Sequence, residues 1–159
     1  EPSFIRVESD EATYSLHIML RLELEIAMLK GDVAVKDIPD AWNERMQSYL
    51  GLTPPDDAHG VLQDIHWAFG GIGYFPTYAL GNVISAQLWQ KINADIPNLD
   101  EQMEKGKYSA LLNWLRENIH RHGAKYEPQD LVERITGSKV TPEPYLKYLE
   151  SKYRQVYSM

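Results

Sequence analysis

Residues 60–78, GVLQDIHWAFGGIGYFPTY, bring together imidazole, carboxylate, amide, indole and phenol groups, which bind substrates and transfer protons in many proteins. Most of the chain has the spacing of amphipathic helix, so these groups fall in its least regular segment. Two interpretations are open: the segment is a tight structural crossing, or it forms one wall of a binding site. The residues concerned are Gln63, Asp64, His66, Trp67, Tyr74 and Tyr78.

The five histidines do not form a recognisable metal motif. None lies in an H-E-x-x-H sequence, and His120 and His122 are two residues apart on a predicted helix, so their side chains point away from each other. His59 and His66 could converge with Asp64, but no spacing rule supports a zinc site there. We therefore expect no metal site built from this chain alone.

Acid–base and nucleophilic chemistry has little support from spacing. Asp64 and His66 are separated by one residue, which does not specify a catalytic triad, and neither a G-x-S-x-G sequence nor a phosphate-binding glycine loop occurs. The glycines at 70, 71 and 73 lie between aromatic residues, where they permit a close approach of the backbone. The absence of cysteine excludes thiol catalysis, Cys-ligated zinc and disulfides from this sequence.

Arg6 lies in an extended segment before the first predicted helix, close to Glu8, Asp10 and Glu11. It could pair with these acids locally, or its guanidinium could be held to bind a carboxylate. The residues alone leave both possibilities open.

Helical periodicity and helix stop signals predict an all-α fold, a single helical region over residues 1–159 with six or seven helices. The first helix, from Asp10 to Leu29, is apolar around most of its circumference, so we expect it to be largely buried, with His17 as a hydrogen-bonded core histidine. The other helices are expected at about 39–50, 78–96, 99–105, 107–123, 128–137 and 141–157. Residues 52–60 are expected to form a turn-rich connector.

Composition is typical of soluble globular proteins, with 159 residues of which 43% are hydrophobic and 25% are charged. The net charge of −7 disfavours nucleic-acid binding, and no apolar run reaches the ~18 residues that cross a membrane. The lack of cysteine and of a signal peptide fits a cytoplasmic protein. The sequence begins at Glu1 in a proline-containing stretch, and we expect it to be part of a longer protein.

Two short sequences resemble signatures of the carboxypeptidase Taq family of thermostable zinc metallocarboxypeptidases. IRVESDE (5–11) is similar to the family's I-R-x-x-A-D-E signature, with Ser9 in the place of its alanine. GVLQDIHW (60–67) matches the signature G-x-x-Q-D-x-H-W at every fixed position. GYFPTYALGN and the C-terminal YLKYLESKY are also similar to the family's closing segment, so the resemblance covers essentially the whole chain.

The resemblance implies that the chain is the C-terminal part of a helical, gluzincin-like peptidase with a cleft. The family's H-E-x-x-H helix, its zinc-binding glutamate and its remaining signatures would precede residue 1. Zinc or cobalt would then be held by a missing N-terminal half, and this chain alone would be inactive. The implied substrate is a peptide that loses single residues from its C-terminus, and the family is expected to form homodimers.

The resemblance also implies roles for individual residues. His66 and Tyr78 are the expected catalytic residues, because both can donate hydrogen bonds to the oxyanion of the transition state. The expected substrate-binding residues are Arg6, which would bind the terminal carboxylate, Tyr74 as a further donor, Gln63 and Asp64, which would orient His66, and Trp67, which would pack against or shape the pocket.

The alternative is a non-catalytic helical module for interaction or dimerisation that descends from the same sequence. An H-E-x-x-H sequence upstream of Glu1 would favour the enzyme, whereas a start codon immediately before Glu1 would favour the module.

Overall fold

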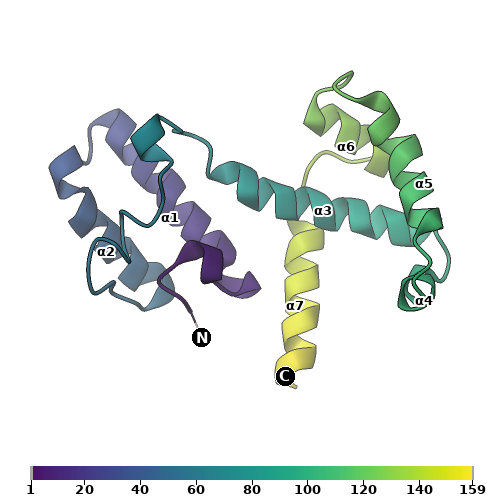
Figure 1. The fold of residues 1–159 in the computed structure, drawn as a ribbon, viewed down its shortest axis with the longest axis horizontal. Helices are drawn as coiled ribbons and strands as arrows, with labels where there is room; N and C mark the ends of the chain where they lie inside the picture. Colours follow the sequence, from purple (N-terminus) through teal and green to yellow (C-terminus); the bar gives the residue numbers. More distant parts are fainter. Residues whose placement is uncertain (1, 159) are drawn as a thin grey trace. The chain divides into compact units, whose positions relative to one another are not determined.

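The computed structural model describes residues 2–158, which contain seven α-helices, four 3₁₀-helices and no β-strand (Figure 1). The predicted all-α class and helix number are confirmed. The α-helices are α1 (Glu11–Lys30), α2 (Ile38–Leu50), α3 (Pro76–Asp95), α4 (Leu99–Glu104), α5 (Ser109–Asn118), α6 (Pro128–Thr136) and α7 (Glu143–Tyr157). The 3₁₀-helices are η1 (Arg6–Glu8), η2 (Val35–Asp37), η3 (Trp67–Phe69) and η4 (His120–His122). Within this described part, no helix combines the length and apolar character needed to span a bilayer.

Contacts within the chain divide it into two compact units, Glu1–Leu80 and Gly81–Met159, and the boundary falls inside α3. Unit 1 holds α1, α2 and the segment 60–78. Unit 2 holds the remainder of α3 and the helices α4 to α7. A single helical region over the whole chain stays a prediction, and the two units are described separately.

Helix α1 has the ends that its sequence predicts. The Asp10 carboxylate accepts a hydrogen bond from the backbone N–H of Thr13 (2.9 Å), which caps the first turn, and Glu11 suits the positive end of the helix dipole. Gly31 follows the last residue with φ of +80°, a left-handed conformation that glycine adopts without strain. The 20 residues of α1 give it a length of about 30 Å, so several segments can pack along it.

The apolar core of unit 1 forms between α1 and α2. Leu20 and Leu24 of α1 pack in one buried cluster with Trp42, Met46 and Leu50 of α2. Burying each large apolar side chain contributes roughly 1.5–3 kcal/mol, so this cluster fixes the position of α1 within unit 1.

Helix α1 also buries three polar residues, His17, Arg21 and Glu25, none of which is more than 1% exposed. Arg21 and Glu25 have polar partners in the segment 60–78, which are described below. His17 is buried as expected, but neither of its ring nitrogens has a hydrogen-bond partner among residues 2–158. The expected hydrogen bond of this histidine is therefore missing.

Several helix boundaries differ from the sequence expectation by one or more residues, and two of them have a local physical reason. Helix α3 begins at Pro76 rather than at Tyr78, since proline is well suited to the first turn, where its missing N–H costs nothing. Helix α5 ends at Asn118, and the stretch expected to continue it forms η4, which ends at His122 and is followed by Gly123. A tighter 3₁₀ turn is a common way to end a helix, because it satisfies carbonyl groups of the last turn.

In unit 2 a buried glutamine of α3 organises a loop. The Gln87 amide donates to Ser138 Oγ (2.9 Å) and to the carbonyl oxygen of Lys139 (3.0 Å), and its oxygen accepts from the N–H of Thr141 (3.1 Å). These bonds tie the connection between α6 and α7 to α3. Apolar burial in this unit comes from Ile92, Leu99, Val132 and Tyr145.

Candidate functional site

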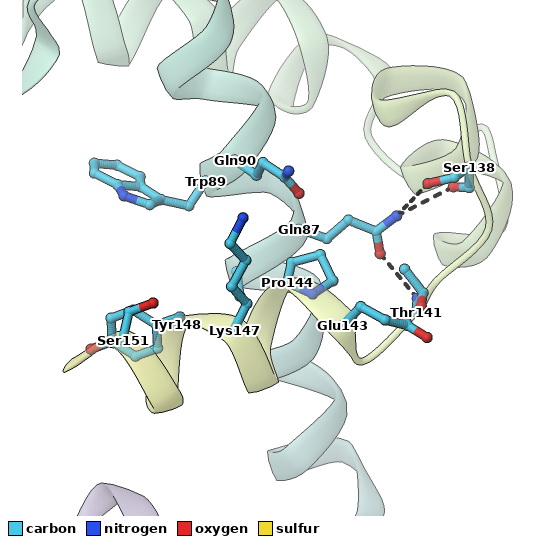
Figure 2. A pocket seen from close by; sticks show the side chains of 11 residues that line it. Gln87, Trp89, Gln90, Ser138, Thr141, Glu143, Pro144, Lys147, Tyr148 and Ser151 are labelled. Carbon is cyan, nitrogen blue, oxygen red and sulfur yellow. Dashed lines mark hydrogen bonds between the residues drawn. The ribbon is translucent and has the colours of Figure 1, made fainter. Parts of the chain in front are cut away.

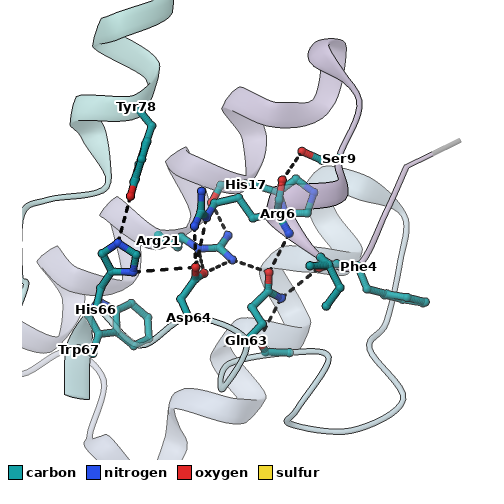
Figure 3. Close-up of polar contacts among 12 residues, drawn as sticks. Phe4, Arg6, Ser9, His17, Arg21, Gln63, Asp64, His66, Trp67 and Tyr78 are labelled. Carbon is teal, nitrogen blue, oxygen red and sulfur yellow. Dashed lines mark hydrogen bonds and ion pairs between the residues drawn. The ribbon is translucent and has the colours of Figure 1, made fainter. Parts of the chain in front are cut away.

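The segment 60–78 is tied to α1 and η1 through the carboxylate of Asp64 (Figure 3). Asp64 Oδ1 accepts from Arg6 Nη2 (2.8 Å) and Nε (3.3 Å), and Oδ2 accepts from Arg21 Nε (2.7 Å). Arg21 is fully buried and Arg6 is 6% exposed. The ion pair of Arg6 is therefore with a residue 58 positions away, and it joins two segments that are distant in the sequence.

Burial and ion pairing act in opposite directions on the pKa values of these three groups. Burial lowers the pKa of the Arg21 guanidinium to about 10, and the charge of Asp64 opposes part of this shift. Burial also disfavours the charged forms of Arg6 and Asp64, but their mutual hydrogen bonds and charges outweigh it. The pKa of Arg6 is raised and that of the Asp64 carboxyl is lowered. All three groups are therefore charged at neutral pH.

The Gln63 side chain satisfies the backbone around this ion pair. Its oxygen accepts from the backbone N–H of Arg6 (2.8 Å) and from Arg21 Nη2 (2.8 Å). Its amide nitrogen lies 3.0 Å from each of three carbonyl oxygens, those of Phe4, His59 and Gly60. Gln63 thus joins the end of the connector, at residues 59 and 60, to residues 4–6 and to Arg21 of α1.

A second attachment to α1 lies further along the same segment. The buried carboxylate of Glu25 accepts the indole N–H of Trp67 at Oε1 (2.9 Å) and the backbone N–H of Gly73 at Oε2 (3.1 Å). Gly73 has φ of +80°, which is accessible to glycine without strain. One carboxylate therefore holds both ends of the turn 67–73.

His66 lies between these two attachments, with its side chain 12% exposed. Its Nε2 is 3.2 Å from the hydroxyl of Tyr78, whereas the buried Nδ1 has no hydrogen-bond partner within residues 2–158 and lies 3.9 Å from Asp64 Oδ1. The rings of Phe75 and Tyr74 lie 4.4 and 5.6 Å from the imidazole ring. Figure 3 shows the imidazole between the Tyr78 hydroxyl and the Asp64 carboxylate.

The glycines predict a close approach of the backbone to neighbouring groups, and at Gly71 these groups belong to the segment 60–78 itself. A Cβ at Gly71 would lie 2.7 Å from the Phe69 ring and 3.1 Å from the carbonyl oxygen of His66. A side chain at this position would therefore push the exposed Phe69 ring aside and press on the backbone carbonyl of His66.

The same segment presents large apolar and aromatic side chains to solvent. Leu62, Ile65 and Phe69 are each at least 66% exposed, and Tyr74 is 51% exposed. The segment is thus polar and buried where it meets α1, and apolar where it is exposed. Such a surface is suited to contact with a peptide or with another protein surface.

Comparison with known proteins shows the family of this chain. A model of the carboxypeptidase Taq (M32) metallopeptidase family matches residues 1–153. The chain belongs to this family.

Members of the carboxypeptidase Taq family match almost the whole chain. Over 157 residues it is 48% identical to thermostable carboxypeptidase 1 of Thermus thermophilus and 46% identical to carboxypeptidase 1 of Bacillus subtilis, which covers 99% of this chain and 31% of each relative. The crystal structure of the M32 carboxypeptidase from Deinococcus radiodurans R1 is similar with a TM-score of 0.96 and 46% identity, covering 100% of this chain and 32% of that one. The chain thus spans about a third of the length of these relatives.

The name of the family implies a metal ion, but the described residues do not fit one. Residues 2–158 contain no group of three or more His, Asp or Glu side chains that could hold an ion. The imidazole of His66 faces Tyr78, and both oxygens of Asp64 are bound by guanidinium groups. The polar cluster of unit 1 is therefore an arrangement of hydrogen bonds and ion pairs.

The structure brings all seven sequence-predicted site residues into unit 1, and their functional roles stay predictions. Arg21 and Glu25 are the residues of this cluster that the sequence analysis missed. A signal was present, since two opposite charges four residues apart interrupt a helix that is otherwise apolar around most of its circumference. Buried charges of this kind are rarely tolerated without partners.

A separate groove of about 620 Å³ lies in unit 2 between α3 and α7 (Figure 2). Its lining includes Trp89 of α3 and Lys147 and Tyr148 of α7, and the Gln87 hydrogen bonds border it. It contains none of the residues singled out from the sequence.

Proposed function

We propose that this chain is the C-terminal part of a metal-dependent carboxypeptidase and supplies one wall of its substrate cleft. The observation that carries this proposal is the His66–Tyr78 pair, held at 3.2 Å on a segment that is fixed by buried charges and carries exposed apolar side chains. Membership of the carboxypeptidase Taq family supports the reaction class, which is hydrolysis of single residues from peptide C-termini.

His66 and Tyr78 are the proposed catalytic residues. Hydrolysis converts the carbonyl oxygen of the scissile bond into an oxyanion, and each hydrogen-bond donor placed there contributes about 2.7–4 kcal/mol to transition-state stabilisation. Because His66 Nε2 and the Tyr78 hydroxyl lie 3.2 Å apart, an oxygen beside the pair can lie within hydrogen-bond distance of both once their mutual hydrogen bond is exchanged. The chain's own part in catalysis is this pair of donors.

The other predicted residues are proposed to bind or shape the substrate site. Tyr74 is half exposed beside His66 and is proposed to contact the peptide, and Trp67 shapes the wall while its indole N–H is held by Glu25. Arg6 has Nε, Nη1 and Nη2 all engaged, with Asp64 and Tyr14, so direct binding of a terminal carboxylate would require exchange of these partners.

The proposal includes zinc or cobalt bound outside residues 2–158, since these residues do not fit a metal site. It also includes a cytoplasmic setting, which the cysteine-free sequence supports, and assembly as a homodimer, for which the family resemblance is the support. Sedimentation equilibrium of the assembled enzyme tests the dimer.

A chimera tests the proposed activity. This chain replaces the matched 157 residues of the Thermus thermophilus relative, and release of the C-terminal residue from a short peptide is measured after loading with zinc or cobalt. The chimera is expected to release the residue, and Tyr78→Phe is expected to lower kcat. Tyr108→Phe, which changes a half-exposed tyrosine of unit 2, is the matched control. A folded, metal-loaded chimera without activity would refute the proposal.

The exposed side chains of Leu62, Ile65 and Phe69 also suit the alternative, a non-catalytic helical interaction module. The same chimera separates the two, because a module predicts that Tyr78→Phe and Tyr108→Phe have equal and negligible effects on peptide hydrolysis.

A further inference from the structure

We propose that Arg21 and Glu25 of α1 form a two-point clamp that positions the imidazole of His66, and that neither residue touches the substrate. The inference rests on the proposed function only for its effect on turnover. The clamp itself is a property of this chain and can be tested without any activity.

The first point of the clamp is Arg21, which is fully buried. Its guanidinium donates through Nε to Asp64, through Nη2 to Gln63 and through Nη1 to the carbonyl oxygen of His17, so each nitrogen has a partner. It also lies 4.6 Å from the ring centroid of Trp42. Arg21 therefore fixes residues 63 and 64, which lie three and two positions before His66.

The second point is Glu25, which is four residues further along α1 and 1% exposed. Its carboxylate accepts hydrogen bonds from the indole N–H of Trp67, the residue after His66, and from the backbone N–H of Gly73, the residue before Tyr74. Residues four apart lie on the same face of a helix, so Arg21 and Glu25 both face the segment 60–78. From this one helix they hydrogen-bond to residues on both sides of His66.

The imidazole itself has few restraints of its own. Nε2 is paired with Tyr78, but the buried Nδ1 has no hydrogen-bond partner within residues 2–158. Its orientation therefore depends on the backbone at 64–67, which the clamp holds, and on the surrounding rings, of which that of Phe75 lies 5.3 Å from the Arg21 guanidinium. A donor displaced by about 1 Å can lose roughly a hundredfold in rate, so this indirect positioning matters for turnover.

The test uses Glu25→Gln in the 1–159 chain, with Glu23→Gln as control. Gln has the shape of Glu, but its amide would place a donor against either Trp67 Nε1 or the Gly73 N–H. Glu23 is on the same helix with its side chain 45% exposed. Heteronuclear NMR is expected to show at least a roughly tenfold faster hydrogen exchange of Trp67 Nε1–H and Gly73 N–H, and shifted imidazole resonances of His66, in Glu25→Gln only.

Trp67→Phe removes the donor instead of the acceptor and is expected to shift the same imidazole resonances. It keeps the test decisive if Glu25→Gln fails to fold. Unchanged His66 resonances in a folded variant whose Trp67 or Gly73 signals have moved would overturn the clamp.

In an active chimera, Glu25→Gln is expected to lower kcat about 10- to 100-fold with little change in KM, and Glu23→Gln is expected to have no effect. An inactive parent chimera would contradict the proposed function and leave the NMR result to decide the clamp. An active chimera in which Glu25→Gln changes neither kcat nor the His66 resonances would contradict the clamp alone.

Discussion

At the scale of single residues, unit 1 depends on a carboxylate that two buried guanidinium groups share. Asp64 is 12% exposed in its side chain, and the side chains of Arg6 and Arg21 are 8% and 0% exposed. Removing one partner of such a buried pair leaves charges that neither water nor protein compensates, and this typically costs 3–5 kcal/mol. The pair therefore decides whether the segment 60–78 can stay docked on α1.

Asp64→Asn should lower the free energy of unfolding by about 3 kcal/mol, because two buried positive charges lose their counter-charge while the side-chain shape is kept. Urea unfolding followed by tryptophan fluorescence measures the change. Asp56→Asn is the control, since Asp56 is more than half exposed and its loss should have little effect. Equal stability of the two variants would show that the ion pair contributes nothing.

His17 should make stability depend on pH. Burial, and then the positive charge of Arg21, lowers its pKa to about 4, whereas the unfolded chain binds the same proton with a pKa near 6.5. The unfolded state therefore binds more protons between these values, so the free energy of unfolding should fall as pH falls through this range, by about 3 kcal/mol in full.

Urea unfolding of the wild type and of His17→Gln at about pH 7.5 and about pH 4.5 measures this dependence. The loss at acid pH should be much smaller in His17→Gln, which cannot titrate, and should persist in the control His59→Gln, whose histidine is half exposed. An equal loss in both variants would assign the pH dependence to other groups.

At the scale of elements, α1 shows what local sequence determines. Its ends follow from the Asp10 cap and from Gly31, and both could be predicted because each involves neighbours in the sequence. The partners of Arg21 and Glu25 in the segment 60–78 could not be predicted, since they lie 42 to 48 residues away and are chosen by tertiary packing. The charges within an apolar helix indicated only that partners must exist.

For the candidate site too, features set by neighbouring residues could be predicted, whereas contacts between distant residues could not. The signature at 60–67 located the segment and His66, and the structure places Tyr78 beside it. That the Arg6 guanidinium is already occupied by Asp64 required the structure, because no local pattern relates residues 58 positions apart.

In unit 2, Gln87 should contribute to stability, because its side chain makes the hydrogen bonds described above between α3 and the loop before α7. Gln87→Ala should lower the free energy of unfolding by about 1–3 kcal/mol, since it leaves the N–H of Thr141 without its acceptor. Gln90→Ala, at an exposed position three residues further along α3, is the matched control. Denaturant unfolding followed by circular dichroism compares the two, and equal stabilities would contradict this role.

At the scale of the whole molecule, the segment 60–78 is proposed to face the substrate, and residues 2–158 contain no group of side chains that could hold a metal ion. It spans 31% of the Thermus thermophilus relative, and its identity with that relative is spread over 99% of its own length. In the proposed role, this segment donates hydrogen bonds to the substrate and shapes its binding site. Substitutions in it should therefore lower kcat more than they lower the metal content.

The most direct test of this account is the effect of His66→Ala on kcat, KM and metal content in the chimera with the Thermus thermophilus relative. The account predicts that kcat falls about 10²- to 10³-fold, as expected for one lost oxyanion donor, while KM changes little and the metal content stays the same. An unchanged kcat at full metal content would contradict the assignment of His66 and, with it, the proposed role of the segment 60–78.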